Sequence, residues 1–209
     1  MAGILLIYIL GIYFLLTKMM QLEDEAVVKK KKTHKELSET THSSNEKAIQ
    51  YVASNMIKEA PKIAITFDDG PSPAWTPKLL DGLKERNVKA TFFLIGENAE
   101  NTPELVKRES EEGHLVGNHT YHHVEITRVP DETAKEEILM TNEVITGITG
   151  EEVSYMRPPF GAWQKKLEWE LDVMPVMWTI DPLDWTTNNE DEIVNKVVTQ
   201  AKENDIILL

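Results

Sequence analysis

Three of the six histidines in the chain lie in the five residues from His119 to His123. His119 and His123 are four residues apart, so on a helical turn both rings would lie on one face, at the separation that two ligands of one cation need. Such crowding is unusual for histidines that only fill a core. The segment therefore predicts a metal site formed by His119 and His123, with His122 as a bystander.

Two adjacent acids, Asp68 and Asp69, follow a short strand pattern at residues 62–67 and precede a Gly-Pro pair. Neighbouring residues on an extended chain point in opposite directions, so the two carboxylates can do different jobs. Asp-Gly-Pro is also a common way to open a turn, and the pair alone does not decide between a turn and a site. Together with two histidines, one of these acids would complete a three-ligand metal site with an open position for water, as in metal hydrolases.

Two further polar clusters follow predicted strands. In the segment 157–161 (Arg-Pro-Pro-Phe-Gly) the prolines stiffen the loop, which makes the backbone N–H of Phe160 a fixed donor suited to an oxyanion. Arg157 offers two parallel donors to a carboxylate, although a rigid loop with a surface arginine would look the same. The segment 181–185 (Asp-Pro-Leu-Asp-Trp) repeats the pattern of acids at a strand end, and Trp185 is either the wall of an acyl pocket or a core aromatic residue.

Strand and helix patterns alternate along the part of the chain that carries these clusters. Thr102 is expected to cap a helix that begins at Pro103 and ends before Gly113. The alternation predicts an α/β fold with parallel strands, either a barrel or an open sheet, in which reactive residues collect where strands end. We expect strands at 62–67, 89–95, 114–117, 153–156, 174–180 and 206–209, and further helices at 46–59, 76–86, 131–147 and 191–203.

The N-terminal residues differ from the rest of the chain. Residues 2–16 are an unbroken apolar run, which favours an uncleaved signal anchor at 1–20 over a cleaved signal peptide. The basic residues lie after this run, which by the positive-inside rule argues against export of the remainder of the chain. Residues 21–60 are polar and charge-mixed, and we interpret them as a spacer with one helix that precedes a catalytic domain at 61–209.

Composition excludes several classes of function. The chain has no cysteine, so disulfides, thiolate metal sites and cysteine nucleophiles are excluded. Its formal net charge of −13 argues against a nucleic-acid partner, since phosphate binding needs clustered lysines and arginines. No feature of the sequence implies a protein partner.

In this order and at these strand ends, the four clusters together resemble the motifs of the polysaccharide deacetylases of carbohydrate esterase family 4. The resemblance covers about residues 61–209. Residues 66–71 match Thr-Phe-Asp-Asp-Gly-Pro letter for letter, His119, Thr120 and His123 match His-Ser/Thr-x-x-His, residues 157–161 match Arg-Pro-Pro-Tyr-Gly except for Phe160, and Asp181, Asp184 and Trp185 match Asp-x-x-Asp-Trp.

The resemblance implies a distorted barrel of about seven strands, of the (β/α)7 type. It implies a hydrolase that removes N-acetyl groups from N-acetylglucosamine in an extracellular glycan, either peptidoglycan or a chitin-like polymer. An acetyl-xylan esterase and an inactive metal- or glycan-binding fragment are the alternatives. The cofactor that it implies is a divalent metal ion, usually zinc or cobalt, with Asp69, His119 and His123 as ligands.

The remaining motif residues receive roles from the same resemblance. Asp68 would be the general base, and Arg157 would orient it. The backbone amide of Phe160 would stabilise the oxyanion, a use that Phe serves as well as the usual Tyr. Asp184 would tune the general acid, and Trp185 and Leu208 would line a pocket for the acetyl group.

A fifth motif of that family, Leu-x-His, supplies its catalytic acid. The chain ends at Leu209, where the next residue would be that histidine. We therefore expect the sequence to be truncated, with the catalytic acid and the last strands of the barrel beyond Leu209. Without the acid, this chain should be slower on amides by about 10²–10⁴, the usual contribution of a general acid.

Overall fold

The computed structural model describes residues 62–169 and 171–209. The signal anchor expected at residues 1–20, the spacer at 21–60 and the helix at 46–59 lie outside the described residues. Among the residues that are described, no helix combines the length and the apolar character that a membrane span requires.

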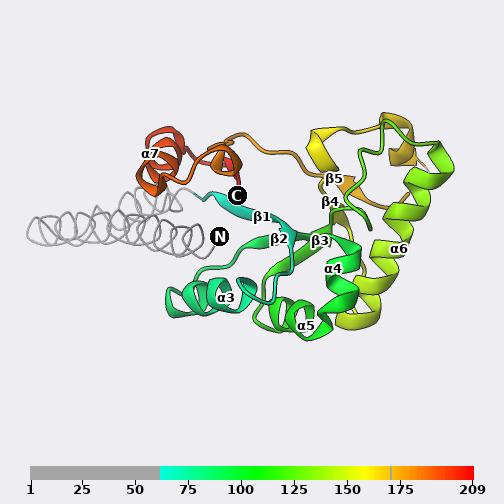
Figure 1. The fold of residues 1–209 in the computed structure, drawn as a ribbon, viewed down its shortest axis with the longest axis horizontal. Helices are drawn as coiled ribbons and strands as arrows, with labels where there is room; N and C mark the ends of the chain where they lie inside the picture. The colour runs from blue at the N-terminus through cyan, green and yellow to red at the C-terminus, as the bar shows by residue number, and fades with distance from the viewer. Residues whose placement is uncertain (1–61, 170) are drawn as a thin grey trace, which may run out of the picture.

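Six parallel strands form one sheet in the order β5-β4-β3-β2-β1-β6 (Figure 1). Strands β1 to β5 follow one another across the sheet, and β6 pairs with the other edge of β1, which is the neighbour order of a curled, barrel-like sheet. The α/β prediction is thus confirmed. The strands are β1 Ala64–Gly70, β2 Thr91–Leu94, β3 Leu115–Asn118, β4 Tyr155–Met156, β5 Met174–Pro175 and β6 Ile206–Leu208.

Parallel strands need long crossover connections, and α-helices lie in most of the connections of this sheet. Figure 1 shows α3 and α5 below the sheet, α4 and α6 to its right, and α7 at the upper left, near the C-terminus. Three short 3₁₀ turns lie in the second half of the chain. The helices are α3 Thr76–Glu85, α4 Gly96–Asn101, α5 Pro103–Glu111, α6 Asp131–Thr149 and α7 Glu190–Gln200, and the 3₁₀ turns are η1 Pro159–Gly161, η2 Lys165–Trp169 and η3 Asp184–Thr186.

Two apolar clusters hold these layers together. In the larger one, Ile65 of β1 and Phe92 of β2 are buried with Leu80 of α3. In the smaller one, Met156 of β4 is buried with Ile138 of α6.

Helices cover the face of the central strands that carries Ile65 and Phe92. On the other face, Thr66 and Phe93 are buried with Arg157. Burial on both faces is why β1 and β2 appear in the sequence as nearly continuous apolar runs.

Some local expectations were wrong. Strand β5 ends at Pro175, whereas a strand as far as residue 180 was expected, because the carbonyl groups of Val176 and Met177 accept hydrogen bonds from the side chain of Arg157. Thr102 precedes α5 as expected, but it makes no side-chain cap, because its hydroxyl donates to the carbonyl of Asn98. Helix α4 was missed, since six residues that begin with glycine carry no apolar period.

The side chain of Glu109 in α5 is fully buried. Its exposed fraction is 0%, and neither of its carboxyl oxygens has a hydrogen-bond partner among the described residues. Burial raises the pKa of Glu109 from 4.5 to about 8. Removing a charge from water without compensation is costly, so the folded protein holds this carboxyl in its protonated, neutral form over most of that range.

We expect Glu109 to make the protein less stable as the pH rises from 4.5 to about 8. The folded state keeps this proton while the unfolded state loses it, so the stability that is present below pH 4.5 is lost as the pH rises through the folded-state value. Glu109→Gln should remove this loss, a few kcal/mol in all, which urea denaturation at about pH 5 and about pH 9 would measure.

The matched control is Glu104→Gln, an exposed glutamate on the same helix, which should behave as wild type at both pH values. The expectation is wrong if the stability difference between wild type and Glu109→Gln is the same at both.

Candidate metal centre and its cleft

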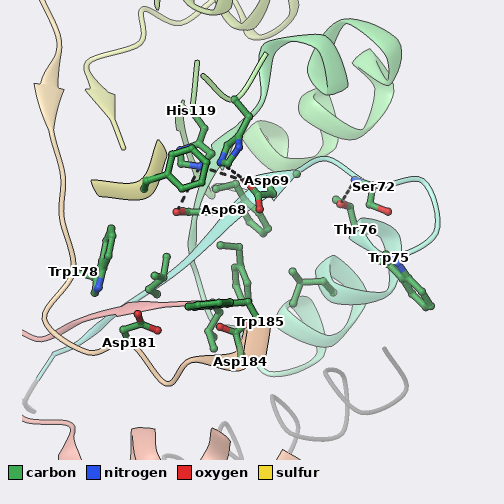
Figure 2. Close-up of a pocket in the computed structure, with 18 of the residues that line it drawn as sticks. Asp68, Asp69, Ser72, Trp75, Thr76, His119, Trp178, Asp181, Asp184 and Trp185 are labelled. Atoms are coloured by element: carbon green, nitrogen blue, oxygen red, sulfur yellow. Dashed lines mark hydrogen bonds and ion pairs between the residues drawn. The ribbon is translucent and has the colours of Figure 1, made fainter. Parts of the chain in front are cut away.

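The carboxyl ends of β1 and β3 and the loops after β4 and β5 border a cleft of about 750 Å³. The structure brings to this cleft every site residue expected from the sequence except Arg157, which lies buried at its edge. Figure 2 shows the carboxylates of Asp68 and Asp69 beside His119, with Trp185 and Asp184 on the opposite side of the cleft.

Asp69, His119 and His123 form a compact group of metal-ligand side chains. One donor atom from each lies within 4.8 Å of the others. Oδ1 of Asp69 is 3.4 Å from Nε2 of His119 and 3.3 Å from Nε2 of His123, and the two imidazole centroids are 4.9 Å apart. Two imidazole nitrogens and a carboxylate that converge in this way fit a single divalent cation.

The tautomer of His119 suits this arrangement. Its Nδ1 is 2.6 Å from the backbone carbonyl oxygen of Arg157, which can only accept, so Nδ1 carries the proton. Nε2 is then the nitrogen that remains to bind a cation, and it faces Oδ1 of Asp69 at 3.4 Å. A hydrogen bond from the far nitrogen of a ligating histidine to a carbonyl is the usual way in which proteins fix such a ring.

The two rings do not meet through a helical turn, and that expectation was wrong. Residues 119–123 form an irregular loop after β3, in which Thr120 (φ 61°) and His123 (φ 55°) adopt left-handed backbone. These two residues turn the chain so that the second ring comes back beside the first. His122 has its ring on Glu137, at 2.7 Å from Nδ1 to Oε1, and it is not a member of the metal-ligand group.

The two adjacent aspartates reach the same cleft, although simple alternation would place them on opposite faces. The register of β1 against β2 shifts between Phe67 and Gly70, and Asp69 has a φ of 66°. A shift of this kind aims a side chain out of the regular alternation, and such irregularities are common beside active sites. Asp69 is thereby directed toward His119 and His123, and Asp68 toward Arg157.

The environments of these aspartates move their pKa values in opposite directions. The contact with His119 lowers the pKa of Asp69, against the opposing effect of burial. Burial raises the pKa of Asp68, and the charges of His119 and Arg157 offset this only in part. Asp69 is therefore the better anion to hold a cation, and Asp68 is the better proton acceptor.

Arg157 is a buried residue and not a surface arginine. Its exposed fraction is 0%. Nη1 donates to Asp68 Oδ1 at 2.8 Å and to the hydroxyl of Thr66 at 2.6 Å, while Nε and Nη2 donate to the carbonyls of Val176 and Met177 at 3.1 and 3.4 Å. The bidentate pairing with a carboxylate that we expected is absent, because the other donors hold the chain after β5.

Aromatic and apolar residues line the rest of the cleft. Phe160 has a φ of 60°, and its exposed ring lies 4.9 Å from the ring of His123. Trp185 is 76% exposed, which excludes a core aromatic residue. Asp184 beside it is buried, and burial raises its pKa against two backbone hydrogen bonds. Leu208 of β6 lines the same cleft.

Sequence reasoning missed three residues of this region. Thr66 lies inside the first motif and could have been singled out there. Trp178 also lines the cleft, but its place in a predicted strand gave no reason to choose it. Glu137 lies in the middle of a helix pattern, and only the fold brings it to the histidine loop.

Comparison with known proteins identifies a family of similar sequences. The family model "Polysaccharide deacetylase" matches residues 55–176. A peptidoglycan-N-acetylglucosamine deacetylase of Bacillus cereus is 43% identical over 150 residues, which are 70% of this chain and 54% of that protein. A chitooligosaccharide deacetylase of Rhizobium leguminosarum bv. trifolii is 39% identical over 150 residues, which are 70% of each protein.

Solved structures agree with this result. The peptidoglycan deacetylase PdaC from Bacillus subtilis superimposes with a TM-score of 0.69 at 38% sequence identity, covering 71% of this chain and 74% of that one. This similarity confirms the fold class expected from the sequence, which is a distorted (β/α) barrel. The chain spans about half the length of the Bacillus cereus relative that it matches.

Arg157→Met should lower the free energy of unfolding by about 3–5 kcal/mol, the usual effect of removing one partner of a buried ion pair. The substitution leaves the half-enclosed carboxylate of Asp68 and two backbone carbonyls without their donor. Urea denaturation at neutral pH measures the change.

Arg128→Met is the control, because Arg128 is 79% exposed in its pair with Glu125, and its loss should change stability by less than about 1 kcal/mol. Equal effects of the two substitutions would contradict the assignment of Arg157 as a buried anchor.

Proposed function

The chain belongs to the polysaccharide deacetylase family, and on that premise we propose that it is a metal-dependent hydrolase that removes N-acetyl groups from N-acetylglucosamine residues of a glycan and releases acetate. The observation that carries the proposal is the convergence of Asp69, His119 and His123 within 4.8 Å, next to a second carboxylate in an open cleft. The names of the similar proteins support peptidoglycan or a chitin-like polymer as the substrate.

The donor set supports zinc as the metal, with cobalt as a substitute. Two neutral imidazoles and one carboxylate are a frequent ligand set of catalytic zinc, and they leave a fourth position for water or substrate. When bound, the ion would acidify that water and polarise the acetyl carbonyl.

Asp68 acts as the general base. One of its oxygens, Oδ1, is held by Arg157, and the other, Oδ2, lies 3.9 Å from Nε2 of His119, on the side of the metal-ligand group. This oxygen takes a proton from the attacking water as the hydroxyl adds to the acetyl carbonyl carbon. The raised pKa of Asp68 improves it as a proton acceptor near neutral pH.

Residues on the other side of the cleft complete the reaction. The backbone amide of Phe160 donates to the oxyanion that forms when water adds. The carbon–nitrogen bond then breaks, acetate leaves, and the sugar nitrogen takes a proton from a general acid that the buried Asp184 tunes. Trp185 and Leu208 enclose the acetyl methyl group.

We extend the proposal to location. Peptidoglycan lies outside the cytoplasm, and the apolar run at residues 2–16 is of the kind that anchors exported proteins. The catalytic domain would then act at the outer side of a membrane, held there by residues 1–20.

Metal content of purified variants tests the assigned roles. Asp69→Ala and His119→Ala should each lower zinc affinity by more than the ~10–100-fold that outer-shell changes cost, because each removes a ligand. Asp68→Asn keeps the shape of the side chain and should retain the metal, while turnover falls by about 10²–10⁴. The roles are reversed if Asp68→Asn loses zinc and Asp69→Ala keeps it.

Acetate release tests the reaction and its substrate class. We expect release from chitooligosaccharides or peptidoglycan, however slow, to stop with a chelator and to return when zinc is added. Release from acetylated xylan with none from these N-acetylated glycans would indicate an esterase. Chelator-sensitive glycan binding without acetate release would indicate a binding module.

A further inference from the structure

Glu137 is a nearly buried carboxylate on α6 that lies against the histidine loop. Its exposed fraction is 7%. Oε2 accepts the backbone amides of Tyr121 and His122 at 3.0 and 2.8 Å, and Oε1 lies 2.7 Å from Nδ1 of His122. One side chain thus binds the part of the loop that separates His119 from His123.

The opposite side of the same peptide groups is bound by α4. The amide of Gly96 donates to the carbonyl of Thr120 at 2.9 Å, and the amide of Glu97 donates to the carbonyl of Tyr121 at 3.0 Å. The first turn of α4 has free backbone amides, which can donate to the loop carbonyls. The backbone carbonyls in the middle of α6 are already bonded within the helix, so only a side chain of α6 can accept the loop amides. Glu137 is that acceptor.

The space between the two helices leaves the loop little freedom. A Cβ atom on Gly96 would lie 2.5 Å from Cδ2 of Tyr121 and 2.7 Å from the hydroxyl oxygen of Thr141. Two residues of the loop, Thr120 and His123, are in left-handed conformations that a free loop would leave. The loop therefore depends on its neighbours for the shape that brings the two rings together.

We propose that Glu137 is a positioning residue for the metal centre, which fixes the loop so that His119 and His123 present their Nε2 atoms to one cation. The inference rests on the proposed function, because it needs that cation to bind. It also explains His122, whose ring is a partner of Glu137 and not a ligand. Glu137 touches neither the metal-ligand atoms nor the substrate cleft, and it acts only through the loop.

Zinc affinity of the purified chain, measured by competition with a chelating dye, tests the inference. Glu137→Met removes both acceptor oxygens while keeping an unbranched side chain of similar length, and zinc affinity should fall by ~10–100-fold, as for other outer-shell changes. Glu137→Gln retains one acceptor oxygen for the two amides and should lose less, about 3–10-fold, by the same reasoning.

Cobalt loading gives a readout that a general loss of stability would not produce. The visible absorption of bound Co²⁺ depends on ligand geometry, and the spectrum of Glu137→Met at saturating cobalt should differ from that of wild type. The matched control is Glu109→Met, a buried glutamate on α5 changed to the same residue. It should alter the free energy of unfolding and leave zinc affinity and the cobalt spectrum unchanged.

The outcomes separate this inference from the function on which it rests. If wild type binds neither zinc nor cobalt, the metal centre itself is wrong. If wild type binds zinc and both Glu137 variants bind it within twofold of wild type, Glu137 is structural and this inference alone fails. If Glu137→Met does not fold, Glu137→Gln decides by the same criterion.

Discussion

The contacts of Arg157 are the interaction on which the site depends. Its side chain holds Oδ1 of Asp68, and its backbone carbonyl accepts the Nδ1 proton of His119. Its amide donates to the carbonyl of Asn118 at the end of β3. A single buried residue thus fixes the proposed base and one proposed metal ligand relative to each other. A charge that is out of water is costly unless it is paired and hydrogen-bonded, and this guanidinium donates to Asp68, to the hydroxyl of Thr66 and to two backbone carbonyls.

This anchoring lets two neighbouring aspartates behave differently. Asp68 lies in a drier environment with a guanidinium partner, and Asp69 lies nearer the opening of the cleft between two imidazoles. The opposite directions of their pKa shifts result mainly from these surroundings, and the charge of the neighbouring Asp69 adds only the smallest contribution to the raised pKa of Asp68. When the pKa values of two neighbouring carboxyl groups differ in this way, the groups can take different roles, here those of base and ligand.

Backbone strain is concentrated in the same region. Of the seven non-glycine residues with positive φ among those described, five belong to the four motif segments, namely Asp69, Thr120, His123, Phe160 and Leu183. Such residues cost about 1–3 kcal/mol each and persist only where the surroundings enforce them. The buried Arg157, the packing of α4 against α6 and the carboxylate of Glu137 supply this enforcement around the cleft.

The sequence by itself determined the alternation of strands and helices, the parallel sheet and the four segments that meet at the cleft, because apolar periodicity and strand ends are local properties. It could not determine how Asp68 and Asp69 share one cleft or how His119 and His123 meet outside a helix, since both depend on left-handed residues and on a register shift in the β1–β2 pairing. The burial of Arg157 and the contact of Glu137 with the histidine loop were decided only by tertiary structure. Both contacts join residues far apart in the chain. Whether a charged side chain is buried, and which groups it then binds, depends on how the surrounding elements pack and not on its local sequence.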